Sequence, residues 1–509
     1  MTDWIVAPTI LPAMTAALLI IAWRLDLQRQ RLVSITATLI LFAVSVGLYQ
    51  LASDGEPRAY FLGDWPAPFG IVLVLDRLSA TMLLLASVLA VAVLIYAVNG
   101  WDARGRHFHA LFQFQLLGIN GAFLTGDLFN LFVFFEVMLI ASYGLMLHGG
   151  GARRLRAGFQ YVAINLVASP LFLIAIGLIY GVVGTLNMAD LAVKVPQVGP
   201  DDQALLRTGA LLLLLVFAIK AALAPLHWWL PATYAAATAP VAALFVIMTK
   251  VGAYSILRVY GLVFGADAGA LADVATPWIV PAALVTLSIG ALGMLACRTL
   301  LDLASFAIVA SMGMLFIALG LFDVAGITTA LYYLVHSTLA GAALFLIVDL
   351  VAQRRGRCLD ELTPAATISQ APLLGAMFLL AAIAIVGLPP LSGFIGKLMI
   401  LDVTYASRQV VLIWSLVLGA TLFMIIGFAR AGSVVFWKSK GTAAASTRGH
   451  ARLEPLVMVA FLIGATAALA VFADAAVQAF ETTAKQALDP ASYINAVLGS
   501  GVAIETPGQ

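Results

Sequence analysis

Glu136 lies near the middle of an apolar stretch, residues 124–145, that is long enough to cross a bilayer as one helix. A charged carboxylate at that depth costs at least about 2.5 kcal/mol on insertion scales, so such a group is expected to have a partner and a function. Nothing near the middle of this stretch offsets the charge, and we expect the partner on another helix. Lys220 is the predicted partner, because the two groups can stay ionised together and breaking the pair leaves a lysine ready to lose its proton. A static salt bridge and sodium coordination by Glu136 are the alternatives.

Further ionisable residues also fall within apolar runs, namely His227, Lys250, His336 and Lys397. A lysine in an apolar interior releases its proton more readily than in water, and a neutral histidine can pass a proton between its two nitrogens. One protonatable side chain per helix suits proton hopping better than binding of a large solute. The residues therefore predict a proton path through Glu136, Lys220, Lys250, His336 and Lys397.

Each of these residues also has a purely structural interpretation. Lys250 and Lys397 can snorkel to the membrane interface, and His336 can hydrogen-bond a neighbouring helix. His227 follows Pro225, so it can either bind carbonyl groups that the proline frees or take part in the relay.

The composition restricts the class of protein. Hydrophobic residues make up 63% of the chain and charged residues only 10%, too few for a soluble protein of 509 residues. The apolar runs have the length of helices, which excludes a β-barrel and predicts an all-α polytopic membrane protein with about fourteen spans. We find no nucleotide-binding loop, haem ligand pair, CxxC set or hydrolytic triad, so we expect no cofactor and no bond chemistry. The formal net charge of +2 gives no indication of nucleic acid binding.

The loop charges support an even number of spans. Arginine and lysine should collect on the cytoplasmic side, and alternate loops between the spans are basic while the others are acidic. The basic loops contain Arg24, Arg29 and Arg31; Arg104 and Arg106; Arg153, Arg154 and Arg156; Arg354, Arg355 and Arg357; and Lys438, Lys440, Arg448 and Arg452. Both termini are therefore predicted to face outside. Residues from 474 onward are expected to be weakly amphipathic and then disordered.

Two spans are expected to be discontinuous, because prolines interrupt their apolar runs. The seventh contains KAALAPLHWWLP (residues 220–231) and the twelfth contains VGLPPLSGFIGK (residues 386–397). Broken helices in corresponding places of two halves indicate an internal repeat, and a repeat of five spans must be inverted. The supporting residues in this interpretation are Pro225, Pro389 and Pro390 at the breaks, and Tyr254, Ser337 and Thr338, which could hold water. The predicted division is 1–107 (spans 1–3), 108–265 (first repeat, spans 4–8), 276–440 (second repeat, spans 9–13) and 453–509 (last span and tail).

At these residues the chain resembles the antiporter-like subunits of respiratory complex I and of Mrp-type multisubunit sodium/proton antiporters. Their signature is a lysine, P-x-H-x-W-L-P, then a second lysine followed by G-x-Y and an arginine. Here it is matched by Lys220, Pro225, His227, Trp229, Lys250, Gly252, Tyr254 and Arg258, and the second signature is matched by GLPPLSGFIGK at 387–397. The phrase TGDLFNLFVFFEVMLIASYGL at 125–145 and Lys397 make the chain most similar to the D subunits of Mrp antiporters.

This resemblance, which covers roughly residues 60–440, implies two inverted five-helix units with discontinuous seventh and twelfth helices. It also implies proton-transfer roles for Glu136, Lys220, Lys250, His336 and Lys397 in a bacterial plasma membrane protein. The implied partners are subunits A, B, C, E, F and G, with protons, Na⁺ and membrane lipid.

Three functions remain open from the sequence. The leading one is a proton-translocating subunit of a sodium/proton antiporter. The second is a proton-pumping subunit of a complex I-like NADH dehydrogenase or a membrane-bound hydrogenase, in which redox chemistry elsewhere drives the same relay. The third is a scaffold subunit with vestigial charges. The sodium site stays unlocated, since no cluster of intramembrane carboxylates suits a hard cation.

Overall fold

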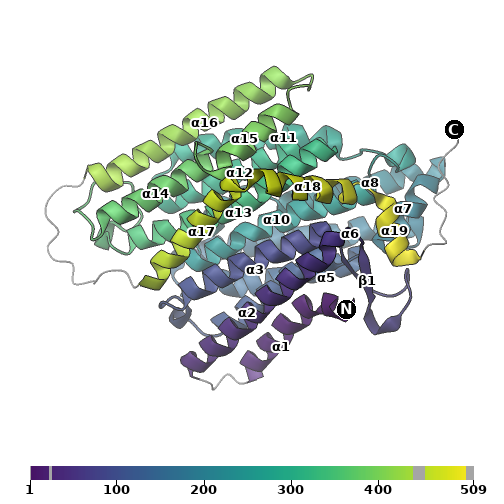
Figure 1. The fold of residues 1–509 in the computed structure, drawn as a ribbon, viewed down its shortest axis with the longest axis horizontal. Coiled ribbons are helices and arrows are strands. Elements are labelled where there is room, and N and C mark those ends of the chain that lie inside the picture. The colour runs from purple at the N-terminus through teal and green to yellow at the C-terminus, as the bar shows by residue number, and fades with distance from the viewer. Residues whose placement is uncertain (1, 22–25, 439–452, 500–509) are drawn as a thin grey trace.

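The chain forms an almost entirely helical bundle in a computed structural model, which describes residues 2–21, 26–438 and 453–499. Figure 1 shows the long helices packed side by side, with α1 and α2 at one edge and α16 at the opposite edge. The long helices are α1 (Ala7–Ile21), α2 (Leu27–Leu51), α3 (Arg77–Ala97), α4 (Phe108–Leu124), α5 (Leu128–Leu147), α6 (Ala152–Val183), α8 (Pro200–Lys220), α10 (Ala239–Leu262), α11 (Thr276–Ala296), α12 (Leu300–Leu319), α13 (Val324–Ala352), α14 (Ala371–Val386), α15 (Ser392–Val403), α16 (Val410–Gly432) and α17 (Leu453–Val471).

Shorter elements connect and cover these helices. They are η1 (Thr2–Val6), η2 (Ala52–Asp54), η3 (Leu62–Asp64), η4 (Asp102–Arg104), α7 (Met188–Lys194), η5 (Val195–Gln197), α9 (Trp229–Ala236), η6 (Gly269–Leu271), η7 (Gly356–Cys358), the π-helical turn η8 (Ser433–Trp437), α18 (Ala473–Ala487) and α19 (Pro490–Leu498). The strands β1 (Arg58–Phe61) and β2 (Val72–Leu75) form an antiparallel hairpin in which Arg58 pairs with Leu75.

In the described part of the chain, 12 helical segments are long and apolar enough to cross a membrane. Two further spans expected from the sequence correspond to α4, which has 17 residues, and to the pair α14 and α15, which a break divides. The polytopic all-α class is confirmed, and the count of fourteen stays a prediction. Of the basic loop residues, Arg24, Lys440, Arg448 and Arg452 lie outside the described residues.

Both predicted breaks are confirmed. The seventh span consists of α8, which ends at Lys220, and α9, which begins at Trp229. The twelfth consists of α14, which ends at Val386, and α15, which begins at Ser392. At each break the backbone can no longer form its i to i−4 hydrogen bonds, so polar groups become free inside the bundle.

The interior of the bundle is built around α10 and α13. Every residue of α10 is buried, and α13 packs against α10, α12, α14, α15, α17 and α18. By contrast, only 28% of the residues in the apolar stretch of α16, and the same share in α17, are buried inside the protein. Most of the surface of these two helices is therefore left for lipid. Nearly all side chains of α10 and α13 are therefore enclosed by protein.

The C-terminal tail differs from the prediction of a weakly amphipathic and then disordered segment. Residues 473–487 and 490–498 form the helices α18 and α19, while 500–509 lie outside the described residues. In α18 the ring of Phe480 packs edge-on against Tyr332 of α13 at 6.4 Å, because one face of this helix is apolar. The helix α19 contacts α7 and β1, and η1 also contacts β1, so the first and last described helices lie at the same end of the bundle (Figure 1).

Candidate functional site

Helix α6 lies between Glu136 and Lys220, and it supplies the polar partner of each. Lys220, the last residue of α8, is buried and donates from Nζ to Asn165 Oδ1 at 2.9 Å. Glu136 on α5 is half-buried and accepts a hydrogen bond from Ser169 Oγ. Asn165 and Ser169 are four residues apart on α6 and share one face of that helix, since residues at i and i+4 lie above one another.

The prediction of a direct ion pair between Glu136 and Lys220 is wrong for this structure. Among the described residues, no contact within 4 Å joins the carboxylate to the ammonium group, and each reaches α6 instead. The two groups are still close enough for the charge of Glu136 to act on Lys220. The physical reason is that an amide oxygen and a hydroxyl group on the intervening helix satisfy both charges first.

The polar backbone groups at the break after Lys220 bond to residues other than His227, which the sequence suggested. Trp229 Nε1 donates to the carbonyl oxygen of Ile219 at 3.0 Å, and Thr286 of α11 accepts from the backbone N–H of Ala224 at 2.8 Å. His227 Nδ1 is buried without a hydrogen-bond partner in the described chain, so this nitrogen does not bind a carbonyl freed by Pro225.

Lys250 lies in the middle of α10 and is completely buried. This burial excludes snorkelling, and its Nζ has no hydrogen-bond partner among the described residues. Gly252, two positions further on, brings α10 against the end of α8, because a Cβ there would lie 2.7 Å from the backbone nitrogen of Ala221. The two lysine-bearing helices are thus in direct backbone contact next to the break.

His336 of α13 points at the second break. Its Nδ1 lies 2.9 Å from Ser392 Oγ, at the first residue of α15. Gly393 permits this approach, since a Cβ on it would be 2.8 Å from His336 Nε2 and 2.1 Å from the carbonyl oxygen of Ala384. The predicted supporting residues Ser337 and Thr338 instead bond to the carbonyl of Leu334 in their own helix.

Lys397 turns back from α15 towards the same break. Its Nζ donates to the carbonyl oxygen of Val386, the last residue of α14, and to Thr421 Oγ1 of α16 at 2.7 Å. The carbonyl is free because the helix ends there, so the break supplies an acceptor for a buried ammonium group. Pro389 and Pro390 are exposed in the connecting turn. Lys397 does not snorkel to the interface.

Electrostatic interactions join the second half of the row. His336 interacts with Lys397 on one side and with Lys250 on the other. A separate interaction joins Glu136 and Lys220. A proton gained or lost at one group therefore changes the affinity of its neighbour for a proton.

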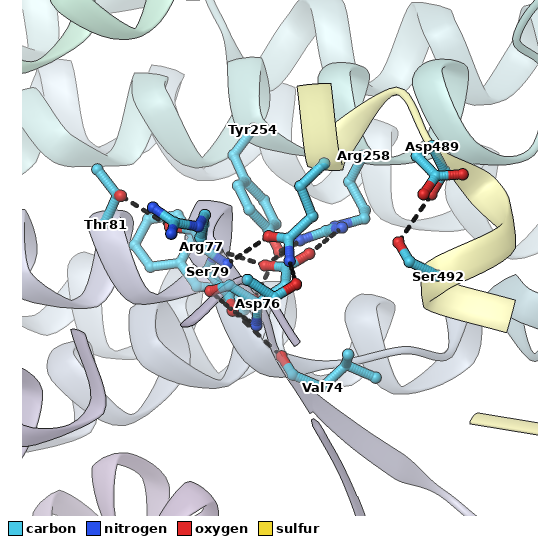
Figure 2. A network of polar contacts seen from close by, with 12 residues as sticks. Val74, Asp76, Arg77, Ser79, Thr81, Tyr254, Arg258, Asp489 and Ser492 are labelled. Carbon is cyan, nitrogen blue, oxygen red and sulfur yellow. Dashed lines mark hydrogen bonds and ion pairs between the residues drawn. The ribbon is translucent and has the colours of Figure 1, made fainter. Parts of the chain in front are cut away.

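A buried ion pair joins Arg258 to Asp76. Arg258 lies on α10, beyond Lys250 and Tyr254 and nearer to one end of the bundle. Figure 2 shows Arg258 and Asp76 joined, with Tyr254 and the helix of Ser492 beside them. Arg258 Nη1 lies 2.6 Å from Asp76 Oδ2, and the hydroxyl of Tyr254 donates to the carbonyl of Phe123 at 2.5 Å. Burial raises the pKa of Asp76, but the charge of Arg258 and the hydrogen bonds from Arg258 and Ser79 together outweigh it and leave that pKa below its usual value. Arg258 Nε also donates to the hydroxyl of Tyr254 at 3.3 Å, so Tyr254 helps to fix this ion pair.

An open cavity of about 500 Å³ borders the N-terminal part of α6. Its lining combines alanines with the polar side chains of Arg153, Arg156, Gln160 and Asp302, which can hydrogen-bond to water. Tyr161, the next residue after Gln160, bonds through its hydroxyl to Ser142 at 2.8 Å. Polar groups therefore continue along α6 from this cavity to Asn165.

Sequence reasoning missed several polar partners of the predicted residues. They are Asn165, Ser169, Ser392, Thr421 and Asp76. A spacing of four between Tyr161, Asn165 and Ser169 in an otherwise apolar helix was the available signal for the α6 partners. In the described ranges, no group of three or more histidine, cysteine or acidic residues could hold a metal ion.

Comparisons with known proteins identify the family of this chain. Residues 125–424 match the family model described as NADH:quinone oxidoreductase/Mrp antiporter, transmembrane. A probable K⁺/H⁺ antiporter D subunit from Rhizobium meliloti is 41% identical, covering 98% of this chain and 99% of the relative. A Na⁺/H⁺ antiporter D subunit from Bacillus subtilis is 35% identical, covering 98% of this chain and 100% of the relative.

Solved structures show the same fold. A chain of the Mrp complex from a Dietzia species superposes with a TM-score of 0.88 at 28% identity, covering 98% of this chain and 100% of that one. A chain of respiratory complex I from Thermus thermophilus gives 0.79 at 23% identity, covering 96% and 100%. The matched family segment contains both helix breaks and the whole row from Glu136 to Lys397, and the protein therefore belongs to the family of membrane subunits shared by NADH:quinone oxidoreductases and Mrp antiporters.

Proposed function

We propose that this chain is the proton-translocating subunit of a multisubunit monovalent cation/proton antiporter. The observation that carries the proposal is the row of five protonatable groups, each on a different helix, beside two helix breaks. Glu136, Lys220, Lys250, His336 and Lys397 lie on α5, α8, α10, α13 and α15. Four of the five are buried, and a structural core rarely retains so many ionisable groups.

Protons would move along this row by changing the charge of one member at a time. A proton that leaves Lys220 would remove a positive charge from the field of Glu136 and so change the affinity of that carboxylate for a proton. His336 can take a proton on one ring nitrogen and release it from the other while Ser392 orients the ring. The membrane potential supplies about 2.3 kcal/mol for each charge per 100 mV, so inward proton flow can drive cation efflux without bond chemistry.

The transported cation is sodium, potassium or both. The similar proteins include a probable K⁺/H⁺ and a Na⁺/H⁺ antiporter subunit. Since hard cations need several oxygen ligands, we place their site at an interface with another subunit. The partners in this proposal are subunits A, B, C, E, F and G, in a bacterial plasma membrane with both termini outside.

We also propose the division predicted from the sequence. Residues 1–107 would form the N-terminal spans, 108–265 and 276–440 the two inverted repeats, and 453–509 the last span with its tail. The breaks after Lys220 and Val386 support this assignment, because one falls in each proposed repeat.

Exchange in membrane vesicles that contain the complete complex tests the proposal. Glu136→Gln and Lys220→Met should each lower Na⁺- or K⁺-dependent proton exchange by at least about tenfold, while the amount of assembled complex stays unchanged. The matched control is Lys485→Met, since Lys485 is an exposed lysine of α18 paired with Glu481. Loss of assembly in both variants would support the scaffold alternative, and full exchange in both would refute the relay. Copurification with flavin and iron–sulfur subunits would instead support a redox-driven pump.

A further inference from the structure

Asn165 and Ser169 stand between the two charged groups at the start of the row. Asn165 Oδ1 accepts from Lys220 Nζ at 2.9 Å, and Ser169 Oγ donates to Glu136. The helix that carries both residues packs against α5 and α8. We propose that Asn165 and Ser169 are positioning residues, which keep Glu136 and Lys220 coupled through their charges while preventing direct sharing of a proton. This inference rests on the proton-relay function proposed above.

The asparagine is held in one orientation. An ammonium group only donates hydrogen bonds, so the atom facing Lys220 must be the amide oxygen. The amide nitrogen Nδ2 then donates to the backbone carbonyl of Tyr161 at 2.8 Å. Asn165 itself is 1% exposed. A neutral amide oxygen accepts a hydrogen bond without taking up the proton, so Lys220 is anchored here but cannot discharge to α6.

The serine has one hydrogen and two acceptors. Its Oγ contacts the carboxylate of Glu136 and also lies 3.1 Å from the backbone carbonyl oxygen of Asn165. When Glu136 is ionised, the hydroxyl donates to the carboxylate. When Glu136 binds a proton, its carboxyl group can donate to Ser169 Oγ, whose own hydrogen turns to the Asn165 carbonyl. The direction of this hydrogen bond thus follows the charge of Glu136, and no proton has to reach Lys220.

Without this separation, the lysine would be drawn to the carboxylate. Lysine has a long, flexible side chain, and the charge of Glu136 already acts on Lys220. A direct ion pair holds both partners in their charged forms, which opposes release of the lysine proton. The other titratable groups nearby are Tyr143, which interacts with Glu136, Tyr161 on α6, and Lys250 on the contacting helix α10.

Two substitutions at Asn165 test the inference in vesicles with the full complex. Asn165→Ala removes the acceptor, so Lys220 should pair with Glu136. The pH optimum of exchange should then move upward by about one to three units, the usual effect of an opposite charge at close range. Asn165→Asp keeps the size and puts a carboxylate beside Lys220, so exchange at neutral pH should fall by at least about tenfold while assembly is retained.

Ser169 is tested with a conservative rescue and a matched control. Ser169→Ala should change the pH profile, and Ser169→Thr should restore it because the hydroxyl returns. Ser45→Ala is the control, since Ser45 is a helical serine that bonds only to the carbonyl of Leu41 in its own helix. Infrared difference spectra of the same variants should show the carboxyl band of Glu136 displaced in Ser169→Ala but not in Ser45→Ala.

The failure of this inference can be separated from failure of the proposed function. If Glu136→Gln and Lys220→Met abolish exchange, while Asn165→Ala and Asn165→Asp keep the wild-type rate and pH profile, only the positioning role is wrong. If Glu136→Gln and Lys220→Met leave exchange intact, the relay itself is wrong. Should Asn165→Ala fail to assemble, Asn165→Asp and the Ser169 pair decide, because unchanged profiles in all of them would overturn the inference.

Discussion

At the scale of single residues, Lys250 is the least compensated group of the row. Lys220 and Lys397 donate to named oxygens, whereas Lys250 Nζ is buried and has no partner in the described chain. An ammonium group in that position is costly, because its lost hydration is not replaced. In the proposed relay, Lys250 would therefore hold a proton only briefly before passing it on.

Substitution of Lys250 should separate transport from stability. Lys250→Met removes the amine at similar volume, so we expect exchange to fall by at least about tenfold and the melting temperature of the purified complex to stay equal or rise. Lys250→Arg should also abolish exchange, because a guanidinium group does not release its proton, but it should lower the melting temperature. Normal exchange in Lys250→Met would remove this lysine from the relay.

The ionisable residues could be predicted from the sequence, but most of their partners could not. Glu136, Lys250 and His336 stand out because charge is expensive in an apolar helix. Serine, threonine and asparagine carry no such signal, since many of them bond to carbonyls of their own helix. Ser337 does so, while Ser392 reaches His336 across two helices. Only the three-dimensional packing distinguishes these two outcomes. The packing of α6 between α5 and α8 is also the reason why Glu136 bonds to Ser169 and not to Lys220.

At the scale of elements, the broken helices are the part that the sequence predicted best. Proline and glycine interrupt helices through their own backbone chemistry, which does not depend on the neighbours. Gly387 at the second break has a φ of +75°, a conformation that favours glycine. The side chain that binds the free carbonyl group at each break could not be predicted in the same way. The carbonyl of Val386 accepts a hydrogen bond from Lys397, whereas that of Ile219 accepts one from Trp229.

A comparison of two glycines tests the packing of the second break. Gly393→Ala places a methyl group 2.1 Å from the carbonyl oxygen of Ala384 and 2.8 Å from His336 Nε2. Overpacking of this kind costs about 1–3 kcal/mol, and it should displace His336 from Ser392. We therefore expect a lower melting temperature and slower exchange. Gly419→Ala on α16 is the control, because no described atom beyond the adjacent turns of its own helix lies within 4 Å of the position that its methyl group would take, and alanine favours helix. Equal behaviour of the two variants would contradict this packing.

At the scale of the whole molecule, two polar clusters tie distant parts of the chain together. Asp76 and Arg258 join the start of α3 to α10, beside the C-terminal helix α19 (Figure 2). Asp102 joins α2 to α4: its carboxylate accepts from Arg31 Nη2 at 2.8 Å and from His109 Nε2 at 3.1 Å. Neither cluster was predicted, because the arginine and the aspartate are 182 residues apart in the first and 71 apart in the second, and nothing in the sequence pairs them.

The Asp102 cluster makes the stability of the whole chain depend on acid pH. Burial raises the pKa of Asp102, but hydrogen bonds from Arg31 and His109 outweigh it and lower that pKa to about 2. An unfolded aspartate titrates near 3.9, so the folded state holds its proton more weakly than the unfolded state does. The resulting stabilisation is fully present above about pH 4 and is lost as the pH falls towards about 2.

Asp102→Asn should lower the free energy of unfolding at pH 7 by about 1.5–3 kcal/mol. Melting temperatures of the wild type and this variant should converge between pH 4 and pH 2, and parallel curves over that range would show that Asp102 does not stabilise the fold through its charge.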